Sequence, residues 1–385
     1  MQTCLLAIGA GTTSIKREQA SLDLGSGSKP AGYGDTPPPE CGLECLISQM
    51  KHGSSNENSI LKRILMGAGN PTHRLAGRGV RLGIGDDAAL FRPKPVHETI
   101  LTCDWFLEGT HFLRDKHPPE AVGWKCLARA VSDVAAMGGV PRCFLLSLAL
   151  PETHTGRWLD AFLGGLRRAA RKFECVLAGG DTTRSLEILI SVAVVGEVRK
   201  ARAVRRSGAR AGDILYVSGR LGEAELGLRT LRSSKKQVRA DNPLLRKHLY
   251  PEPRLALSQW LAKNGLATAM MDLSDGFSSD LPRLCDASGV GARVEIARIP
   301  AVRISDEDRS RGIDPLQLAL HGGDDYELLF TSSPNKVQKL PRAFRGVALT
   351  PIGRMTKKLE LVLLEENGCA QQLKPGGWDP FRAAR

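Results

Sequence analysis

The chain has 385 residues, 42% of them hydrophobic and 25% charged, which is typical of a globular protein with about two domains. Lys and Arg total 54 against 41 Asp and Glu, and the net charge of +13 permits acidic partners without choosing among them. Aromatic residues make up only 5%, and no apolar run approaches the roughly 20 residues of a membrane span. We therefore expect neither a nucleic-acid-binding protein nor a membrane protein.

Residues 1–53 differ from the rest of the chain. The stretch 25–40 is rich in Gly, Ser and Pro and has no hydrophobic periodicity, so we expect an extension that is disordered or mis-annotated. Met50 is a candidate for the true first residue, in which case residues 1–49 are not translated. The start has no basic residue before its short apolar patch, which argues against a signal peptide. The nine Cys are scattered and odd in number, which favours reduced thiols in a cytoplasmic protein.

Patterned sequence begins at 56–65, where Ile60, Leu61, Ile64 and Leu65 fall on one helical face. From about residue 80, short apolar runs alternate with amphipathic helices, which predicts an α/β fold. Expected helices cover 119–138, with Pro119 in the first turn and Gly138 as the C-terminal cap, and 155–173. Expected strands cover 80–85, 99–104, 144–150, 175–181, 188–198, 214–219, 269–275, 292–296, 327–331 and 359–366. Charge and glycine rise around 200–212, which predicts one domain over 54–203 and a second over 204–385.

Aspartates recur at the ends of these apolar runs. They are Asp86, Asp87, Asp104, Asp181, Asp272, Asp275, Asp324 and Asp325. Loops at the ends of strands build ligand sites in α/β folds, and several carboxylates meeting there repel one another unless a cation lies between them. Magnesium ions combine a few carboxylates with water and substrate phosphates. The pattern therefore predicts a site for Mg²⁺ and phosphate, although a single Asp alone is more often a turn or cap residue.

Glycines accompany these aspartates, as in Gly179–Gly180 and Gly322–Gly323, and allow backbone N–H groups to approach phosphate oxygens. The string GIGDDA fits a dinucleotide-binding pattern formally, but two adjacent carboxylates would repel a pyrophosphate. The chain contains no P-loop, no protein-kinase motif set and no G-x-S-x-G elbow. We infer phosphate chemistry outside those enzyme classes.

The motifs GIGDDAAL, CDWFLEGTHF, VSDVAAMGG, LAGGDTT, RSGARAGD, MDLSDG, HGGDDYELLF and GGWDPF occur in that order. Over about 57–381 the chain resembles the thiamine-monophosphate kinase family. That resemblance implies transfer of the ATP γ-phosphate to thiamine monophosphate, making thiamine diphosphate. It also implies two α/β domains, the first of which pairs with a second copy into a barrel-like homodimer.

The resemblance also implies roles for individual residues. The Mg²⁺ ligands would be Asp87, Thr102, Asp104, Asp133, Asp272 and Asp275. ATP would be bound by Gly180, Asp181, Arg206 and Ser274, and thiamine monophosphate by His111, Asp324 and Trp378. No covalent nucleophile is expected, because direct in-line transfer to an already ionised phosphate needs none.

Two positions depart from the family pattern. Asp324 stands where the family commonly has Glu, and Cys103 stands where the family often has Thr, in Thr-Thr-Asp or Ser-Thr-Asp. A thiol is a poor Mg²⁺ ligand, so Cys103 would contribute at most its backbone. Three alternatives stay open: another ATP-using member of the aminoimidazole ribonucleotide synthetase superfamily, such as a hydrogenase-maturation-like enzyme, a degenerate homologue, and a basic nucleic-acid-binding protein.

Overall fold

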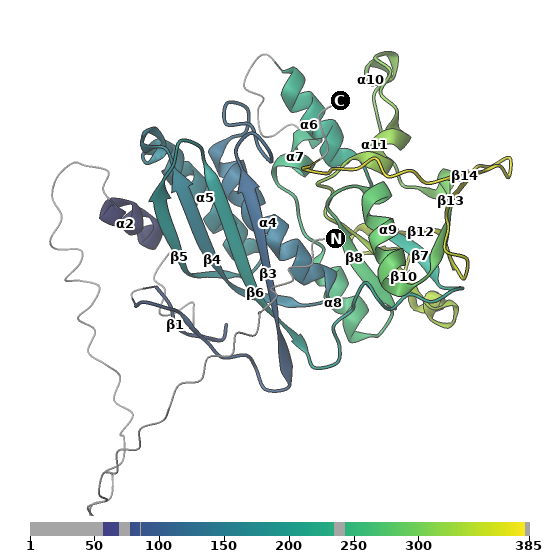
Figure 1. The fold of residues 1–385 in the computed structure, drawn as a ribbon, viewed down its shortest axis with the longest axis horizontal. Helices are drawn as coiled ribbons and strands as arrows, with labels where there is room; N and C mark the ends of the chain where they lie inside the picture. Colours follow the sequence, from purple (N-terminus) through teal and green to yellow (C-terminus); the bar gives the residue numbers. More distant parts are fainter. Residues whose placement is uncertain (1–56, 69–77, 85, 235–242, 382–385) are drawn as a thin grey trace, which may run out of the picture. The chain divides into compact units, whose positions relative to one another are not determined.

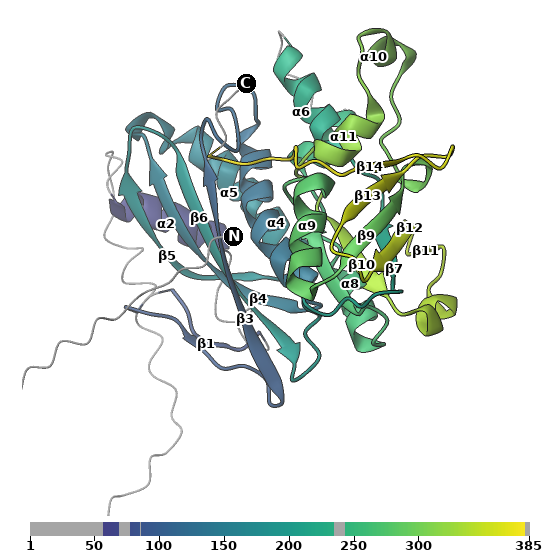
Figure 2. The same cartoon turned by 45° about the vertical axis from the view of Figure 1, so that its right-hand side comes forward.

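A computed structural model describes residues 57–68, 78–84, 86–234 and 243–381, all within the unit His52–Arg385. The predictions about the extension 1–53 and about Met50 lie outside these residues. Within them, no helix combines the length and the apolar character that crossing a membrane requires. The described chain folds around two larger sheets, shown in two orientations in Figures 1 and 2.

The first half is built on a four-stranded sheet with the strand order β3-β6-β4-β5, in which only the β4–β5 pair is parallel. Helices α4 and α5 pack together against one face of this sheet. A short hairpin of β1 and β2 packs on this sheet, where Val80 joins Cys143 and Ala178 in a small core. The elements are α2 (Glu57–Ala68), β1 (Val80–Leu82), β2 (Leu90–Phe91), β3 (His97–Leu107), α4 (Pro119–Ala136), β4 (Val140–Leu150), α5 (Arg157–Lys172), β5 (Val176–Arg184) and β6 (Leu189–Arg199).

Helix α4 is the central helix of this half and is buried on nearly all sides. Pro119 begins it, and Gly138 follows its C-cap with a φ of 73°, so the sequence prediction of both ends is confirmed. Gly123 on α4 and Gly165 on α5 allow the two backbones to touch. A Cβ at either position would lie inside van der Waals distance of a carbonyl group on the other helix. This close packing fixes which α4 side chains face the second half.

The second half is built on an eight-stranded sheet with the path β14-β13-β9-β12-β7-β10-β8, to which β11 adds beside β12. The pairing is antiparallel except between β9 and β13. Its elements are β7 (Ile214–Ser218), α6 (Glu223–Ser233), α7 (Pro243–Leu249), α8 (Leu255–Lys263), β8 (Ala269–Leu273), α9 (Phe277–Ser288), β9 (Gly291–Glu295), α10 (Asp306–Ser310), α11 (Pro315–His321), β10 (Glu327–Ser332), β11 (Ala343–Phe344), β12 (Val347–Thr356), β13 (Leu361–Leu364) and β14 (Ala370–Gln372).

Both faces of this sheet are covered, which explains why its central strands read as continuous apolar runs. Along β7, Leu215 and Val217 join the core beneath α9, while Tyr216 joins the core beneath α8. Helix α8 also contacts α4 of the first half. The two halves therefore meet through α4, α8 and β8.

The α/β class and every expected strand and helix within the described residues are confirmed, with shifted bounds. The expectation that each apolar run ends at its aspartate is wrong for two of them. Asp104 pairs with Val192 in the middle of β3, and Asp181 lies inside β5. The reason is that both strands extend beyond the apolar run through pairing with a neighbour, β3 with β6 and β5 with β4.

Candidate active site

Four aspartates gather where the two halves meet, and we call them the acidic cluster: Asp104 on β3, Asp133 on α4, Asp272 on β8 and Asp275 just after β8. The hydroxyl of Thr102 donates to Asp133, and the hydroxyl of the buried Ser132 donates to Asp272 at 2.6 Å. Four of the predicted metal-binding carboxylates, with Thr102, are thus brought together by three separate elements.

Burial and mutual repulsion both disfavour full ionisation of the acidic cluster. Burial, followed by the charge of Asp133, raises the pKa of Asp104 to about 6. The same two causes raise the pKa of Asp272 to about 8. Carboxylates that repel one another in a largely buried site are suited to binding a hard cation such as Mg²⁺, which would offset the repulsion. Within the described residues no three carboxylate, imidazole or thiol groups are close enough to hold an ion by themselves, so water and phosphate oxygens would complete its shell.

A buried carboxylate that the sequence analysis missed shapes this edge. Asp280 in the first turn of α9 accepts hydrogen bonds from the amides of Ser274 and Asp275, both at 3.1 Å. Arg283 donates to Asp275 at 2.6 Å and to Asp280 at 2.8 Å. The turn after β8 is therefore held in one conformation, with Gly276 at a φ of 101°. A helix N-terminal Asp is a recognisable signal, but its partners are not visible in the sequence.

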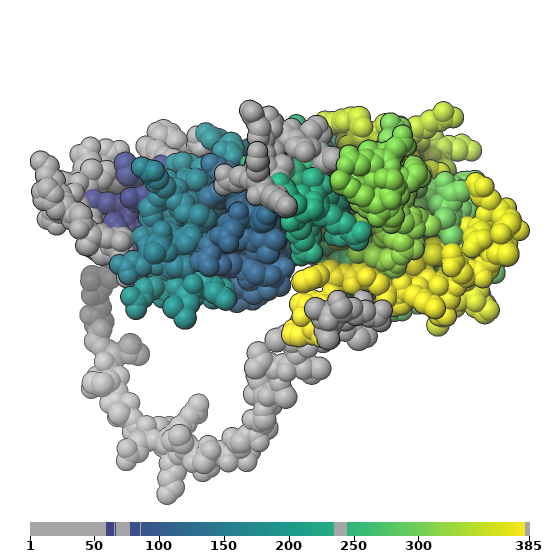
Figure 3. All heavy atoms as spheres, turned by 90° about the horizontal axis from the view of Figure 1, so that it is seen from above, coloured from purple at the N-terminus to yellow at the C-terminus, as the bar shows by residue number. Residues whose placement is uncertain are grey.

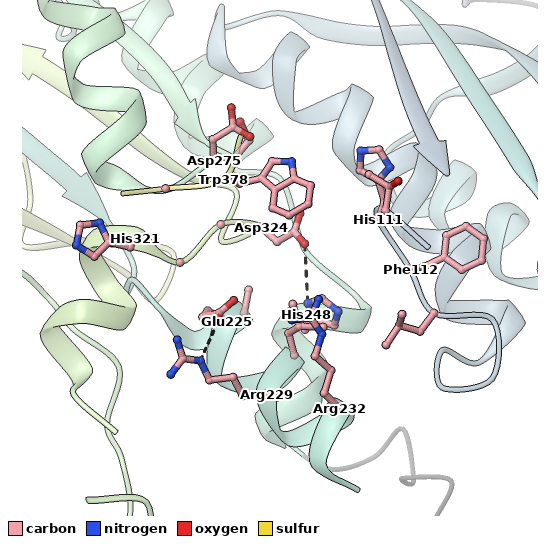
Figure 4. A pocket seen from close by; sticks show the side chains of 18 of the residues that line it. His111, Phe112, Glu225, Arg229, Arg232, His248, Asp275, His321, Asp324 and Trp378 are labelled. Carbon is pink, nitrogen blue, oxygen red and sulfur yellow. Dashed lines mark hydrogen bonds and ion pairs between the residues drawn. The ribbon is translucent and has the colours of Figure 1, made fainter. Parts of the chain in front are cut away.

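Next to the acidic cluster lies a cavity of about 350 Å³, which we call the first cavity. Figure 4 shows His111 on one side and Asp275, Asp324 and Trp378 on the other. Its walls come from the loop after β3, from α4, α6, α7 and α11, and from the C-terminal segment. Asp275 belongs both to the acidic cluster and to the wall of this cavity.

Asp324 is the central carboxylate of a network of charged side chains in the wall of the first cavity. It accepts from Lys125 Nζ at 2.8 Å and from the hydroxyl of Tyr326 at 2.7 Å, and Arg129 lies 3.5 Å away. Although burial opposes ionisation, Lys125 and Arg129 hold the pKa of Asp324 well below its usual range. Its φ of 66° lies in the left-handed region, which Asp tolerates better than most residues.

Lys125 is itself buried, and its ammonium group also lies 3.2 Å from Nδ1 of His248. The sequence analysis missed both residues. For Lys125 the signal was present, since Lys125 and Arg129 stand four residues apart in the stretch 121–131, which is otherwise apolar, and must share a face.

Arg129 has an unused donor. Its guanidinium lies 5.5 Å from the centre of the Phe106 ring, and its buried Nε has no hydrogen-bond partner among the described residues. A buried N–H without a partner is costly, so Arg129, which lines the first cavity, is a candidate donor to a ligand oxygen. We consider Arg129 the most informative residue that the sequence analysis overlooked.

The His111 ring is held neutral. The amide of Leu107 donates to its Nδ1 at 3.0 Å, so Nε2 carries the proton and can donate to a ligand. Burial, with smaller contributions from Arg129 and Lys125, lowers the pKa of His111 to about 4. The ring is therefore a neutral hydrogen-bond donor at physiological pH.

The C-terminal segment closes the first cavity. It runs back from β14 toward the first half, and Figure 3 shows it in yellow along the surface of the second half. The amide of Trp378 donates to the carbonyl of Asp275 at 2.8 Å, and that of Gly376 to Ser278 at 3.2 Å. A Cβ at Gly377 would overlap the carbonyl of Asp275, so only glycine permits this approach. Trp378 lines the cavity while 45% of it remains exposed, ready to be covered by a ligand.

The remaining predicted residues, apart from Ser274, lie outside this constellation. Asp87 is exposed, and its amide donates to the carboxylate of Asp86 at 2.8 Å. Gly180 and Asp181 lie on β5, an outer strand of the first sheet. Arg206 is exposed, although its charge partly offsets the burial that raises the pKa of Asp133 and of Asp272. Ser274 lines the first cavity, and the exposed Cys103 contacts Ser191 at 3.3 Å. The structure thus brings together the metal and substrate candidates more fully than the ATP candidates.

Known protein families match both halves of the described chain. The family described as "AIR synthase related protein, N-terminal domain" matches residues 85–198, and "AIR synthase related protein, C-terminal domain" matches 210–364. Thiamine-monophosphate kinase of Escherichia coli K12 is 37% identical over 309 residues, 78% of this chain and 92% of the relative.

Two solved structures extend the comparison. AaThiL, from Aquifex aeolicus, complexed with AMPPCP and TMP, is 35% identical with a TM-score of 0.66, and the match covers 77% of this chain and 91% of that one. The hydrogenase maturation protein HypE in complex with ATP is 20% identical with a TM-score of 0.67, covering 84% and 96%, and shares the fold alone.

Fold and matched domains define a member of the AIR synthase related class of enzymes. Within that class, the sequence identity to thiamine-monophosphate kinases extends over most of their length and identifies the family. The chain belongs to the thiamine-monophosphate kinase family and is an enzyme of that kind.

Proposed function

We propose that the chain transfers the γ-phosphoryl group of ATP directly and in line to the phosphate of thiamine monophosphate, in the last step of thiamine diphosphate synthesis. One observation carries this assignment. Asp275 is shared between the acidic cluster and the first cavity, so an acceptor phosphate in the cavity would lie beside the place where the carboxylates gather. The relative AaThiL, solved with AMPPCP and TMP, supports the same pair of substrates.

The first cavity supplies what a thiamine phosphate needs. The phosphate would accept from Nε of Arg129, which has no hydrogen-bond partner among the described residues, and from Nε2 of His111. The half-exposed indole of Trp378 would pack on the heterocycle, which carries a positive charge. Asp324, kept ionised by Lys125, would orient Arg129.

Magnesium would be held by Asp104, Asp133, Asp272 and Asp275 with Thr102, and by Asp87 if the segment that carries it approaches. When bound, the ion would neutralise the negative charges of the phosphates during transfer. Gly180, Asp181, Arg206 and Ser274 are proposed to contact ATP, as the family resemblance implies. The residues themselves do little proton chemistry, because the acceptor oxygen is already ionised. Their contribution is to orient the two phosphates and to exclude water.

The test is an ADP-release assay with Mg²⁺ and ATP, with and without thiamine monophosphate, and with the product identified by chromatography. Thiamine diphosphate formed one-for-one with ADP supports the proposal. ATP binding without product would refute the acceptor and direct the search to other substrates of the superfamily. Absence of both product and ATP binding would refute the nucleotide assignment as well.

We also propose that the enzyme is a homodimer formed through the open face of the first sheet. Leu101 and Trp105 on β3 and Leu145 on β4 project from the face opposite α4 and α5, and they are 74%, 58% and 41% exposed. Adjacent large apolar side chains on one face are typical of an interface. Light scattering should give twice the chain mass, and Leu101→Asp with Trp105→Asp should give the monomer. Leu186→Asp, at a 93% exposed position outside this face, is the control and should remain dimeric.

A further inference from the structure

A second cavity of about 400 Å³ lies in the second half and contains none of the residues assigned above to metal, ATP or thiamine phosphate. We call it the basic cavity. Five of its ten lining residues are cationic and three are carboxylates; the ten are Arg220, Glu223, Arg246, Lys247, Tyr250, Glu252, Arg254, Val302, Arg303 and Asp325.

The three carboxylates of the basic cavity are already engaged. Glu223 pairs with Lys247 at 3.4 Å, and Glu252 with Arg246 at 3.6 Å. Asp325 accepts from the backbone amides of Gly222 at 2.6 Å and Ala224 at 3.1 Å, at the start of α6. These carboxylates therefore do not neutralise the remaining guanidinium groups of the wall.

Arg254 is engaged as well, because it pairs with the fully buried Glu327 behind the wall. Arg220 and Arg303 are different. Among the described residues neither has a carboxylate partner, and Arg220 donates only to the carbonyl of Ala301, at 3.3 Å. The hydroxyl of Tyr250 likewise has no hydrogen-bond partner in the described part of the chain.

The fold forces the two arginines together. Leu221 forms a bridge with Ala301, its amide donates to Pro300, and the amide of Val302 donates back to it, so the segments carrying Arg220 and Arg303 are joined beside the cavity. Two guanidinium groups that face one space repel each other unless an anion lies between them. Guanidinium forks match phosphate oxygens in charge and geometry.

We propose that the basic cavity is a second binding site, for a small phosphorylated anion with at least two negative charges, held by Arg220 and Arg303 with Tyr250 as a further donor. The site is separate from the first cavity and does not depend on the proposed function. The start of α6 is the wall between the two: Glu223 lines the basic cavity, whereas Ala224 and Glu225 line the first cavity.

The test uses inorganic pyrophosphate as the probe, titrated into the full chain by calorimetry in EDTA, so that metal-dependent phosphate binding at the acidic cluster does not contribute. The Arg220→Ala/Arg303→Ala variant should bind at least roughly tenfold more weakly, since each charge-assisted contact is worth about that factor. Arg303→Glu, at an exposed position, tests the same site with little risk to the fold.

Two matched variants each remove two positive charges elsewhere. Arg229→Ala/Arg232→Ala changes the first cavity, and Arg309→Ala/Arg342→Ala changes exposed arginines outside both cavities. Both should retain wild-type affinity. Loss of binding in the first-cavity variant alone, equal loss in the surface control, or no measurable binding by the wild type would each overturn the proposal.

Discussion

Replacing Arg129 with Met tests the substrate site most directly. The change keeps a long apolar stem against Phe106 and removes the guanidinium, while Asp324 retains Lys125 at 2.8 Å. One charge-assisted hydrogen bond to a phosphate is worth about 1.5–3 kcal/mol. That energy predicts a loss of roughly 10- to 150-fold in kcat/KM for thiamine monophosphate. The KM for ATP should stay within about twofold of the wild-type value, because Arg129 is not proposed to bind ATP.

The assay is ADP release at varied thiamine monophosphate and saturating Mg²⁺-ATP, with the melting temperature as a check on folding. Arg129→Lys is the matched variant, since it keeps the charge but loses the planar guanidinium. Its kcat/KM should lie between those of the wild type and of Arg129→Met. A kcat/KM for Arg129→Met within threefold of wild type, in a folded protein, would refute the role assigned to the unpartnered Nε.

Three further outcomes follow from the geometry. Asp275→Asn should abolish turnover while leaving the melting temperature within a few degrees, measured by ADP release and calorimetry; near-normal rates would remove Asp275 from the metal site. Trp378→Ala should raise the KM for thiamine monophosphate more than that for ATP, and equal changes in both would argue against packing on the heterocycle. The pKa of His111 is lowered to about 4, so its ring stays neutral as the pH falls from 6.5, where an unfolded His becomes charged. NMR of the Cε1–H group should therefore show no titration between pH 5.5 and 8, and a midpoint near 6.5 would contradict the buried, amide-bonded ring.

The sequence predicted elements where one local signal was strong. Pro119 and Gly138 delimit α4 because each has a backbone preference that acts within one turn. The sequence could not show that Asp104 lies inside a strand, because the length of β3 depends on its pairing with β6. The shorter helices α6, α7, α8 and α11 were not predicted, since their apolar faces are brief. Helix α8 packs on the sheet, whereas α6 and α7 pack against each other.

For the candidate site, the motifs identified the carboxylates but not the groups that control them. Lys125, Arg129 and His248 act on Asp324 from two helices. The spacing of Lys125 and Arg129 predicts a shared helix face, but nothing in the sequence predicts that this face meets Asp324. Asp280 likewise acts on the turn at 274–275 through backbone amides. Positions that bear chemistry can be read from motifs, whereas the contacts that set their charge and orientation arise only in the folded chain.

The first cavity has a consequence for how the protein assembles. Its walls join the loop at 109–113 to the segment at 376–378, nearly the full span of the described chain, while each half has a core of its own. Bringing together segments so far apart in the sequence costs conformational entropy and slows their association. The cavity should therefore be among the last features to form during folding. A ligand that bridges these walls would act as a clamp on the docked halves, and hydrogen exchange at their junction should slow when it binds.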